Sequence, residues 1–484
     1  MAAIGGAAGI LLAFVGAHFL LVLFPNDVAN LNIPSVTKIP IDRGVFLFAL
    51  LTTLLTALLS GIAPVLKAAQ TEAGGAISGS TRTGTAGRQS NRLRSAVVTG
   101  EVALSLMLLT GAALVVASFQ KVVNADLGFQ PDHVLSLQLF LPPDRYPRDD
   151  PHKTSIFVDE VVNRLAALPG VKSAAATNFL PLTGFWGTTN FLLRGHAQPK
   201  EGDAPEADNR VITPEHLRTM GIPLLRGRAF TNEDRAGGLQ VALINQTFAR
   251  QYFKDTDPVG QELNLGTPEK PEWWRIVGVT GDVKSFGQDQ PTHADIYRPF
   301  DQDPFPIIAF TLRTETDPAA IIKAAEQTLW TADPDLPVFK AIPMDILANQ
   351  TLAVRRASSV LISGFALLAL LLACIGIYAA MAYAVSQRTP EIGIRMALGA
   401  RRADVLRMVL GFDFRITFIG VAIGLAGALA LSRLLVSLLF ETSAINPLIF
   451  SLATGALVGI ALLASLVPAR RAASIDPMRA LRAE

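Results

Sequence analysis

The stretch ASSVLISGFALLALLLACIGIYAAMAYA, residues 357–384, decides the fold class because no residue in it carries a charge. An apolar run of about 20 residues crosses the roughly 30 Å hydrocarbon layer of a membrane as an α-helix. The alternative, a buried core helix of a soluble protein, is disfavoured because five further runs are similar and only 17% of the chain is charged. The six runs are residues 1–24, 44–66, 96–119, 357–384, 414–439 and 448–467.

Basic residues indicate which side of the membrane each connection occupies. They gather after the second, fourth and sixth runs. If the six spans alternate in direction, these three basic regions lie on the same side of the membrane, and the positive-inside rule makes that side cytoplasmic. Residues 120–356 then lie outside and are too long for a loop, so we expect a folded extracytoplasmic domain. The net charge of +2 gives no reason to expect a nucleic-acid partner. The basic residues are Lys67, Arg82, Arg88, Arg92 and Arg94, then Arg388, Arg395, Arg401, Arg402 and Arg407, then Arg470, Arg471, Arg479 and Arg482.

The outer domain is expected to be of the α+β class. Two strand–helix–strand units favour a ferredoxin-like, porter-type piece, and a strand-rich insertion at about residues 189–297 separates them. The insertion includes predicted strands at 240–245 and 275–283 with a helix at 246–253 between them. The two units are predicted at 133–140, 153–168 and 171–178, and at 307–313, 318–330 and 338–341.

A short charged segment, QRTPEIGIRMALGARR at residues 387–402, predicts a capped amphipathic helix between two apolar runs. Such a helix either lies on the membrane surface or docks into a soluble partner. Its predicted N-cap is Thr389 and its first-turn acid is Glu391. Ile392, Met396 and Val405 share one face, and the other side carries Arg388, Arg395, Arg401 and Arg402.

No residue pattern indicates catalysis. Residues 74–81 have the glycine spacing of a phosphate loop but lack its lysine, so they are better explained as part of a flexible cytoplasmic linker at residues 71–90. The histidines lack zinc-site spacing, and a single cysteine, Cys374, excludes a disulfide within the chain. We therefore expect no enzyme activity, no catalytic or metal-binding residues and no cofactor site.

Three further features allow more than one interpretation. The pair Trp273–Trp274 is either a binding surface or strand packing, and Glu101 marks either a transport path or a structural contact near the membrane edge. Gly420, Gly424 and Gly427 suit close packing of helices, which fits an assembled dimer without requiring one.

The chain carries a weak internal repeat. Residues 41–69 align without gaps with residues 445–473, and both end in a Pro-x-x-basic-Ala-Ala exit. The alignment favours a duplicated membrane unit whose first copy is incomplete.

The segment 387–402 together with PARRAASIDPMRALR, residues 468–482, resembles the FtsX-like permease domain of MacB-type ABC transporters. Further pieces are similar to the periplasmic core domain of duplicated permeases best known from acidobacteria. They are LPGV at 168–171, MGIPLLRGRAF at 220–230, DPVG at 257–260 and IVGVTGDV at 276–283.

The resemblance implies a domain organisation. Residues 1–66 would be the last two spans of an incomplete first unit, and the chain either a fragment of a longer duplicated permease or a partly degraded copy. Residues 67–95 would be the cytoplasmic linker and 96–119 the first span of a second unit. Residues 120–356 would form the MacB-like periplasmic core domain, and 357–484 the FtsX-like permease domain with three spans, a coupling helix and a tail.

The resemblance also implies a function. The chain would be a multi-pass permease of the bacterial inner membrane that couples ATP hydrolysis by a separate cytoplasmic ATPase to periplasmic movement and substrate export. An FtsX-like regulator that signals to periplasmic partners such as cell-wall hydrolases is the alternative. Expected partners are the ABC ATPase, the lipid bilayer, a second permease copy or paired permease, and a periplasmic protein. The coupling helix would use Thr389, Glu391, Ile392, Arg395, Met396, Arg401 and Arg402.

Overall fold

The chain forms two compact units in the computed structural model. The helical unit comprises Met1–Val122 with Ala353–Glu484, and the sheet unit comprises Val123–Leu352. The structure describes residues 83–147, 150–195, 204–387 without 255 and 268, and 401–473 without 437, 438 and 441, together with parts of 4–16, 43–58 and 392–398.

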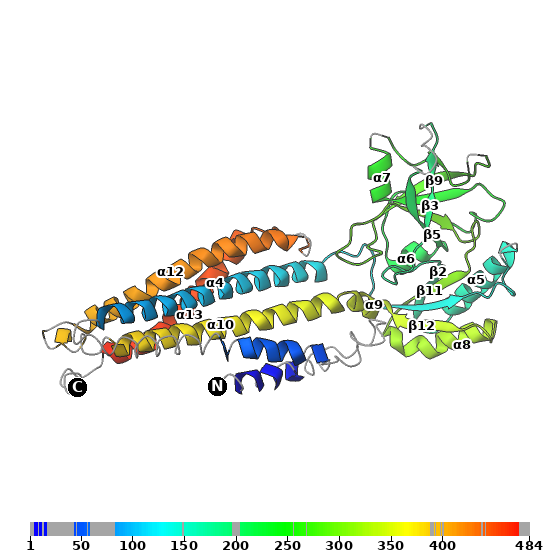
Figure 1. Ribbon diagram of the computed structural model, residues 1–484. Coiled ribbons are helices and arrows are strands. Elements are labelled where there is room, and N and C mark those ends of the chain that lie inside the picture. The colour runs from blue at the N-terminus through cyan, green and yellow to red at the C-terminus, as the bar shows by residue number, and fades with distance from the viewer. Residues whose placement is uncertain are drawn as a thin grey trace. The chain divides into compact units, whose positions relative to one another are not determined.

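Four long helices run side by side in the helical unit (Figure 1). Each contains a segment long and apolar enough to cross a membrane, which confirms four of the six predicted spans. The first two predicted spans are seen only as shorter apolar helices, Ile4–Gly16 and Phe46–Leu55, and most of the remainder of those runs lies outside the described residues. The long helices are α4 (Thr83–Val123), α10 (Ala353–Gln387), α12 (Arg402–Leu434) and α13 (Pro447–Ala473).

Helix α4 begins earlier than expected. Residues 83–95, predicted as the last part of the cytoplasmic linker, are helical and continuous with the span that follows. The flexibility predicted for residues 83–90 is therefore wrong, because this segment extends an existing helix without a new nucleation step.

The glycines of α12 face α4 at close range. A Cβ atom on Gly420 or Gly424 would lie 3.0 Å from the carbonyl oxygen of Thr99 or Ala103, and one on Gly427 would overlap Met107. The close packing expected of these glycines is therefore present, and it joins two helices of one chain. On α10, Gly376 likewise leaves room for the side chain of Glu101. A Cβ atom on residue 376 would overlap the Oε2 atom of that carboxylate.

One half of the sheet, built from the first two and the last two strands of the sheet unit, confirms the predicted ferredoxin-like piece. Its four strands have the order β12-β1-β11-β2 and are antiparallel throughout. Apolar side chains of α5 and α8 pack on the sheet around Leu137 and Phe310, and each fully buried chain of this size stabilises the fold by about 1.5–3 kcal/mol. The elements are β1 (Val134–Phe140), α5 (Pro151–Ala166), β2 (Val171–Thr177), β11 (Ile307–Thr314), η1 (Pro318–Ile321), α8 (Ile322–Ala332) and β12 (Val338–Pro343).

The inserted half continues the same twelve-stranded sheet as β2-β5-β10-β7-β9-β8-β4, with β3 beside β5 and β6 beside β9. The strand-rich insertion is confirmed, and two of its pairs, β5 with β10 and β7 with β9, are parallel. Its strands are β3 (Thr188–Asn190), β4 (Leu192–Leu193), β5 (Glu206–Ile212), β6 (Leu224–Gly227), β7 (Val241–Asn245), β8 (Glu262–Asn264), β9 (Trp273–Thr280) and β10 (Asp295–Pro299), and the remaining helices of the sheet unit are α6 (His216–Met220), α7 (Gln246–Tyr252) and α9 (Met344–Thr351).

Candidate functional site at the end of the helical unit

A short helical segment between α10 and α12 is anchored in the helical unit. Ile392 and residues 394–396 are helical, and the Leu398 N–H donates a hydrogen bond of 3.0 Å to the carbonyl oxygen of Ile394. Ile392 is fully buried in a cluster that also contains Met381 of α10, Val405 of α12 and Ala469 of α13, with Met396 packed against it. The face predicted for Ile392 and Met396 is thus the buried one, whereas Val405 does not share their helix and joins the cluster from α12. The cluster ties the segment to three spanning helices at once.

The opposite side of this segment is exposed and apolar. The exposed fraction is 49% for Ile394 and 83% for Leu398, and Arg395 is exposed beside them. Positions four residues apart are neighbours on a helix surface, so Ile394 and Leu398 form one patch. We call Ile394, Arg395 and Leu398 the docking face. Exposed apolar patches beside polar or basic side chains mark sites of interaction with a protein or with a membrane surface.

The sequence analysis missed Ile394 and Leu398. The available signal was the presence of two apolar pairs, Ile392 with Met396 and Ile394 with Leu398, set two residues apart. Two residues turn a helix by about 200°, so the pairs lie on opposite sides. A helix that is apolar on both sides needs a second surface to cover it.

The predicted helix does not continue to Arg402. Arg401 has extended backbone angles, and its N–H donates to the carboxylate of Asp404 at 3.2 Å, which caps the start of α12. Arg402 is the first residue of α12. This corrects the predicted end of the segment, because Asp404 favours a new helix start at Arg401. Thr389 and Glu391 lie outside the described residues.

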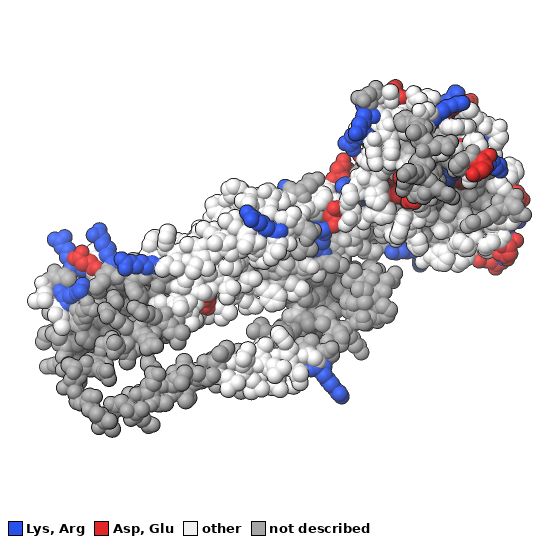
Figure 2. Space-filling model, turned by 45° about the horizontal axis from the view of Figure 1, so that its top comes forward, with Lys and Arg blue, Asp and Glu red and all other residues white. Residues whose placement is uncertain are grey.

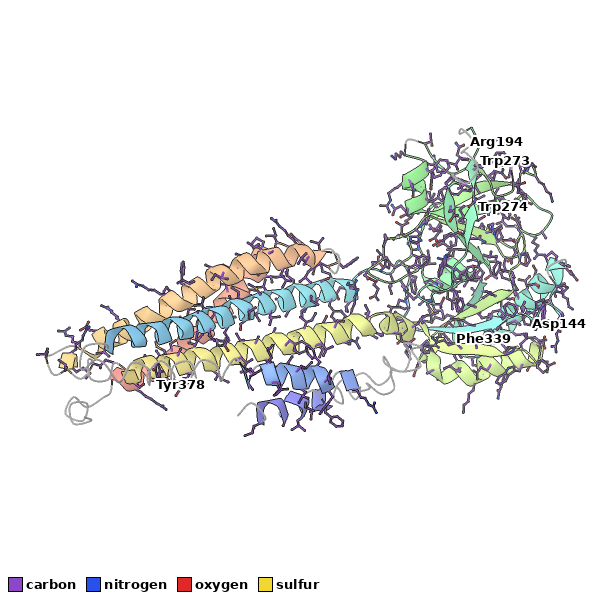
Figure 3. All side chains as sticks on the ribbon, in the orientation of Figure 1. Asp144, Arg194, Trp273, Trp274, Phe339 and Tyr378 are labelled. Carbon is purple, nitrogen blue, oxygen red and sulfur yellow. The ribbon has the colours of Figure 1, made fainter. Side chains whose placement is uncertain are left out.

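Basic side chains gather at this end of the helical unit. Figure 2 shows Lys and Arg side chains clustered where α12 begins, while the middle of the helices is nearly free of them. Helix α13 ends here with Arg470 and Arg471, which complement the negative end of its dipole. Arg471 lies 3.4 Å from the hydroxyl of Tyr378 on α10, labelled in Figure 3. The end that holds the docking face is therefore strongly positive.

The two adjacent tryptophans of β9 have different environments (Figure 3). Trp274 is 2% exposed, and the guanidinium of Arg298 lies 5.4 Å from its ring centre. Trp273 points to the other side of the strand, where Arg194 covers it at 5.1 Å. Strand packing therefore accounts for Trp274, and a cation–π contact for Trp273.

Three charged side chains are buried together in the sheet unit. Asp208 of β5 and Asp295 of β10 are paired in register, and both are within 3.5 Å of Arg210. Burial raises the pKa of Asp295 to about 7 against the opposing effect of Arg210. Burial also lowers the pKa of His216 to about 3. Among the residues that the structure describes, no group of three or more His, Cys, Asp or Glu could hold a metal ion.

Comparison with known proteins places these features in a family. The MacB-like periplasmic core domain matches residues 95–328, and the FtsX-like permease C-terminal domain matches residues 363–477. The macrolide export ATP-binding/permease protein MacB of Agrobacterium fabrum is 31% identical over 284 residues, covering 55% of this chain and 42% of that protein. The uncharacterized ABC transporter permease YknZ of Bacillus subtilis is 25% identical over 361 residues, covering 71% and 84%.

A MacB of Aeromonas hydrophila is 29% identical over 279 residues, and the match again spans 42% of that protein. Among solved structures, the periplasmic region of MacB from Actinobacillus actinomycetemcomitans matches with a TM-score of 0.32 and 14% identity, covering 48% of this chain and 97% of that one.

The spanning helices and the separate sheet unit define a multi-pass membrane protein of the bacterial inner membrane with an inserted periplasmic α+β domain. With both domains matched, the chain belongs to the FtsX-like, MacB-type family of ABC transporter permeases.

Proposed function

We propose that this chain is a permease subunit that transmits movement from a separate cytoplasmic ATPase to its periplasmic domain, and that this movement drives export of a substrate. The observation that carries the proposal is the two-sided segment at residues 392–398. Ile392 is buried among three spanning helices, and the docking face opposite it is exposed.

A rigid anchor allows such a segment to transmit force. Core side chains are closely packed and yield little to displacement. A push on Leu398 is therefore passed to the ends of α10, α12 and α13 through the Ile392 cluster. The positive charge around the docking face would attract an acidic surface on the ATPase.

ATP would be bound by the partner subunit, and a second permease copy would complete the assembly. Export is favoured over a signalling role because curated relatives are named as macrolide and pyoverdine exporters. The substrates named there belong to those proteins, and the match spans less than half of their length.

The docking face is tested by Leu398→Asp and Arg395→Glu in reconstituted vesicles with the partner ABC ATPase. We expect permease-stimulated ATP hydrolysis to fall about tenfold or more, because an apolar contact and a charge contact each contribute on the order of 1.4 kcal/mol to docking.

The matched control is Leu239→Asp, since Leu239 is 59% exposed and lies in the sheet unit. It should leave stimulation unchanged. Wild-type stimulation in both docking-face variants, with normal membrane insertion, would refute the proposed role of this segment.

A further inference from the structure

A cavity of about 570 Å³ opens in the inserted half of the sheet unit. This is within the range of about 300–1,000 Å³ typical of small-molecule sites. Residues from β3, β5, the end of α7 and the loop before β10 line it. The lining side chains used below are Trp186, Glu206, Asp208, Tyr252, Phe286 and His293.

One wall of the cavity is a row of rings. The ring centres of Trp186 and Phe286 are 6.0 Å apart in an edge-on arrangement, and those of Phe286 and His293 are 4.5 Å apart. Trp186 is 59% exposed although it could bury a large apolar area. Tyr252, from the end of α7, adds another ring to the lining. Several aromatic faces are thus available to one ligand.

The charged side chains that line the cavity are two carboxylates, of which Glu206 is the exposed one. Glu206 and Asp208 are two residues apart on β5, so their side chains emerge on the same face of the strand. Glu206 is exposed, and no cation among the described residues forms an ion pair with it. Asp208 is 3% exposed, with its Oδ2 3.4 Å from Nδ1 of His293. None of the described lining residues is Lys or Arg.

A second cavity on α7 has the opposite character. It measures about 690 Å³, and Arg226, Arg250 and Lys254 are among its lining residues. The acidic, aromatic lining therefore distinguishes the first cavity from this second one.

We propose that the cavity lined by Trp186 and Glu206 binds an organic cation with apolar substituents, such as a quaternary ammonium or phosphonium ion. Cations are attracted to the faces of Trp, Tyr and Phe within about 6 Å, and a nearby carboxylate strengthens this attraction where water is displaced. This inference rests on the proposed function in that the bound cation would be the class of substrate exported. Binding is measured without ATPase or nucleotide, so its failure is distinct from a failure of coupling.

The test uses the full chain in lipid nanodiscs, with tetraphenylphosphonium as the probe and its anionic isostere tetraphenylborate as the control. Equilibrium dialysis against empty nanodiscs corrects for uptake by lipid. We expect saturable binding of the phosphonium that weakens by about tenfold in Trp186→Ala and in Glu206→Gln. Trp330→Ala should bind as the wild type does, because Trp330 is also partly exposed (43%) but lies on α8.

Trp186 and Glu206 are both exposed, so neither substitution should unfold the protein. Equal phosphonium affinity in the wild type and both cavity variants would overturn the proposal. Equally saturable borate binding, or no binding beyond that of empty nanodiscs, would do the same.

Discussion

At the scale of single residues, the buried group Asp208, Arg210 and Asp295 makes stability depend on pH. Two carboxylates share one guanidinium inside the sheet. Oδ1 of Asp295 is 3.5 Å from Nε of Arg210, so their attraction is mainly that of charges without a close hydrogen bond. One positive charge cannot fully compensate two buried negative ones.

Asp295→Asn is predicted to remove a pH dependence. The pKa of Asp295 is raised to about 7 in the folded state and is about 3.9 when unfolded. Between these values the folded state binds more protons, so its free energy of unfolding falls as pH rises, by up to ~1.4 kcal/mol per pH unit. Relative to Asp295→Asn, the wild type should lose stability from about pH 5 to pH 7.

Urea unfolding followed by tryptophan fluorescence measures this in the intact chain. All four tryptophans, Trp186, Trp273, Trp274 and Trp330, belong to the sheet unit.

His216 contributes a pH dependence of stability with the opposite sign. Its pKa is lowered to about 3, so the unfolded state binds the extra proton and the free energy of unfolding falls as pH drops below about 6.5. Both proteins contain His216, so the difference between the wild type and Asp295→Asn reports the Asp295 carboxyl alone. If the free energies of unfolding of the two proteins change with pH in parallel, the raised pKa of Asp295 is contradicted.

At the scale of elements, α12 packs on α4 through its glycine face. Gly424→Val should destabilise the helical unit by about 1–3 kcal/mol, because the new side chain meets Leu106 and the backbone of Ala103. Gly459→Val on α13 is the control, since a Cβ there has nothing within 4 Å. Thermal unfolding in detergent should separate the two variants by several degrees, and equal melting temperatures would argue against this helix contact.

Most elements of the sheet unit could be predicted from the sequence because periodicity and turn residues act locally. The strand predicted at 307–313 is β11, and the helix predicted at 153–168 is α5. The pairing of the inserted strands could not be predicted, since the parallel pairs β5–β10 and β7–β9 depend on contacts distant in the chain. The cavity was missed for the same reason, because Trp186, Glu206 and His293 meet only after folding.

The site at residues 392–398 was predicted only in part. The buried face followed from helical spacing, but Leu398 was not recognised because its exposure depends on where Ile392 is anchored. Arg401 was assigned to the wrong helix, since the capping by Asp404 competes with continuation of the preceding helix.

At the scale of the whole molecule, the sheet unit and the docking face should be accessible from opposite sides of the membrane. Leu239 in the sheet unit and Leu398 in the docking face are both exposed. In a Cys374→Ala background, a membrane-impermeant maleimide added to intact spheroplasts should label Leu239→Cys. It should label Leu398→Cys only after lysis. Labelling of Leu398→Cys before lysis would invert the orientation derived from the basic residues.

The position of β1 has a consequence for synthesis of the chain. In the part of the sheet that the structure describes, β1 pairs with β11 on one edge and with β12 on the other. Strand β11 starts roughly 170 residues after β1 ends, which takes on the order of ten to thirty seconds at about 5–20 residues per second. Until then the apolar strand VLSLQLF has no partner on either edge. The nascent periplasmic domain therefore has a period during which an unpaired strand must be shielded from aggregation, and the inserted half must be synthesised before that period can end.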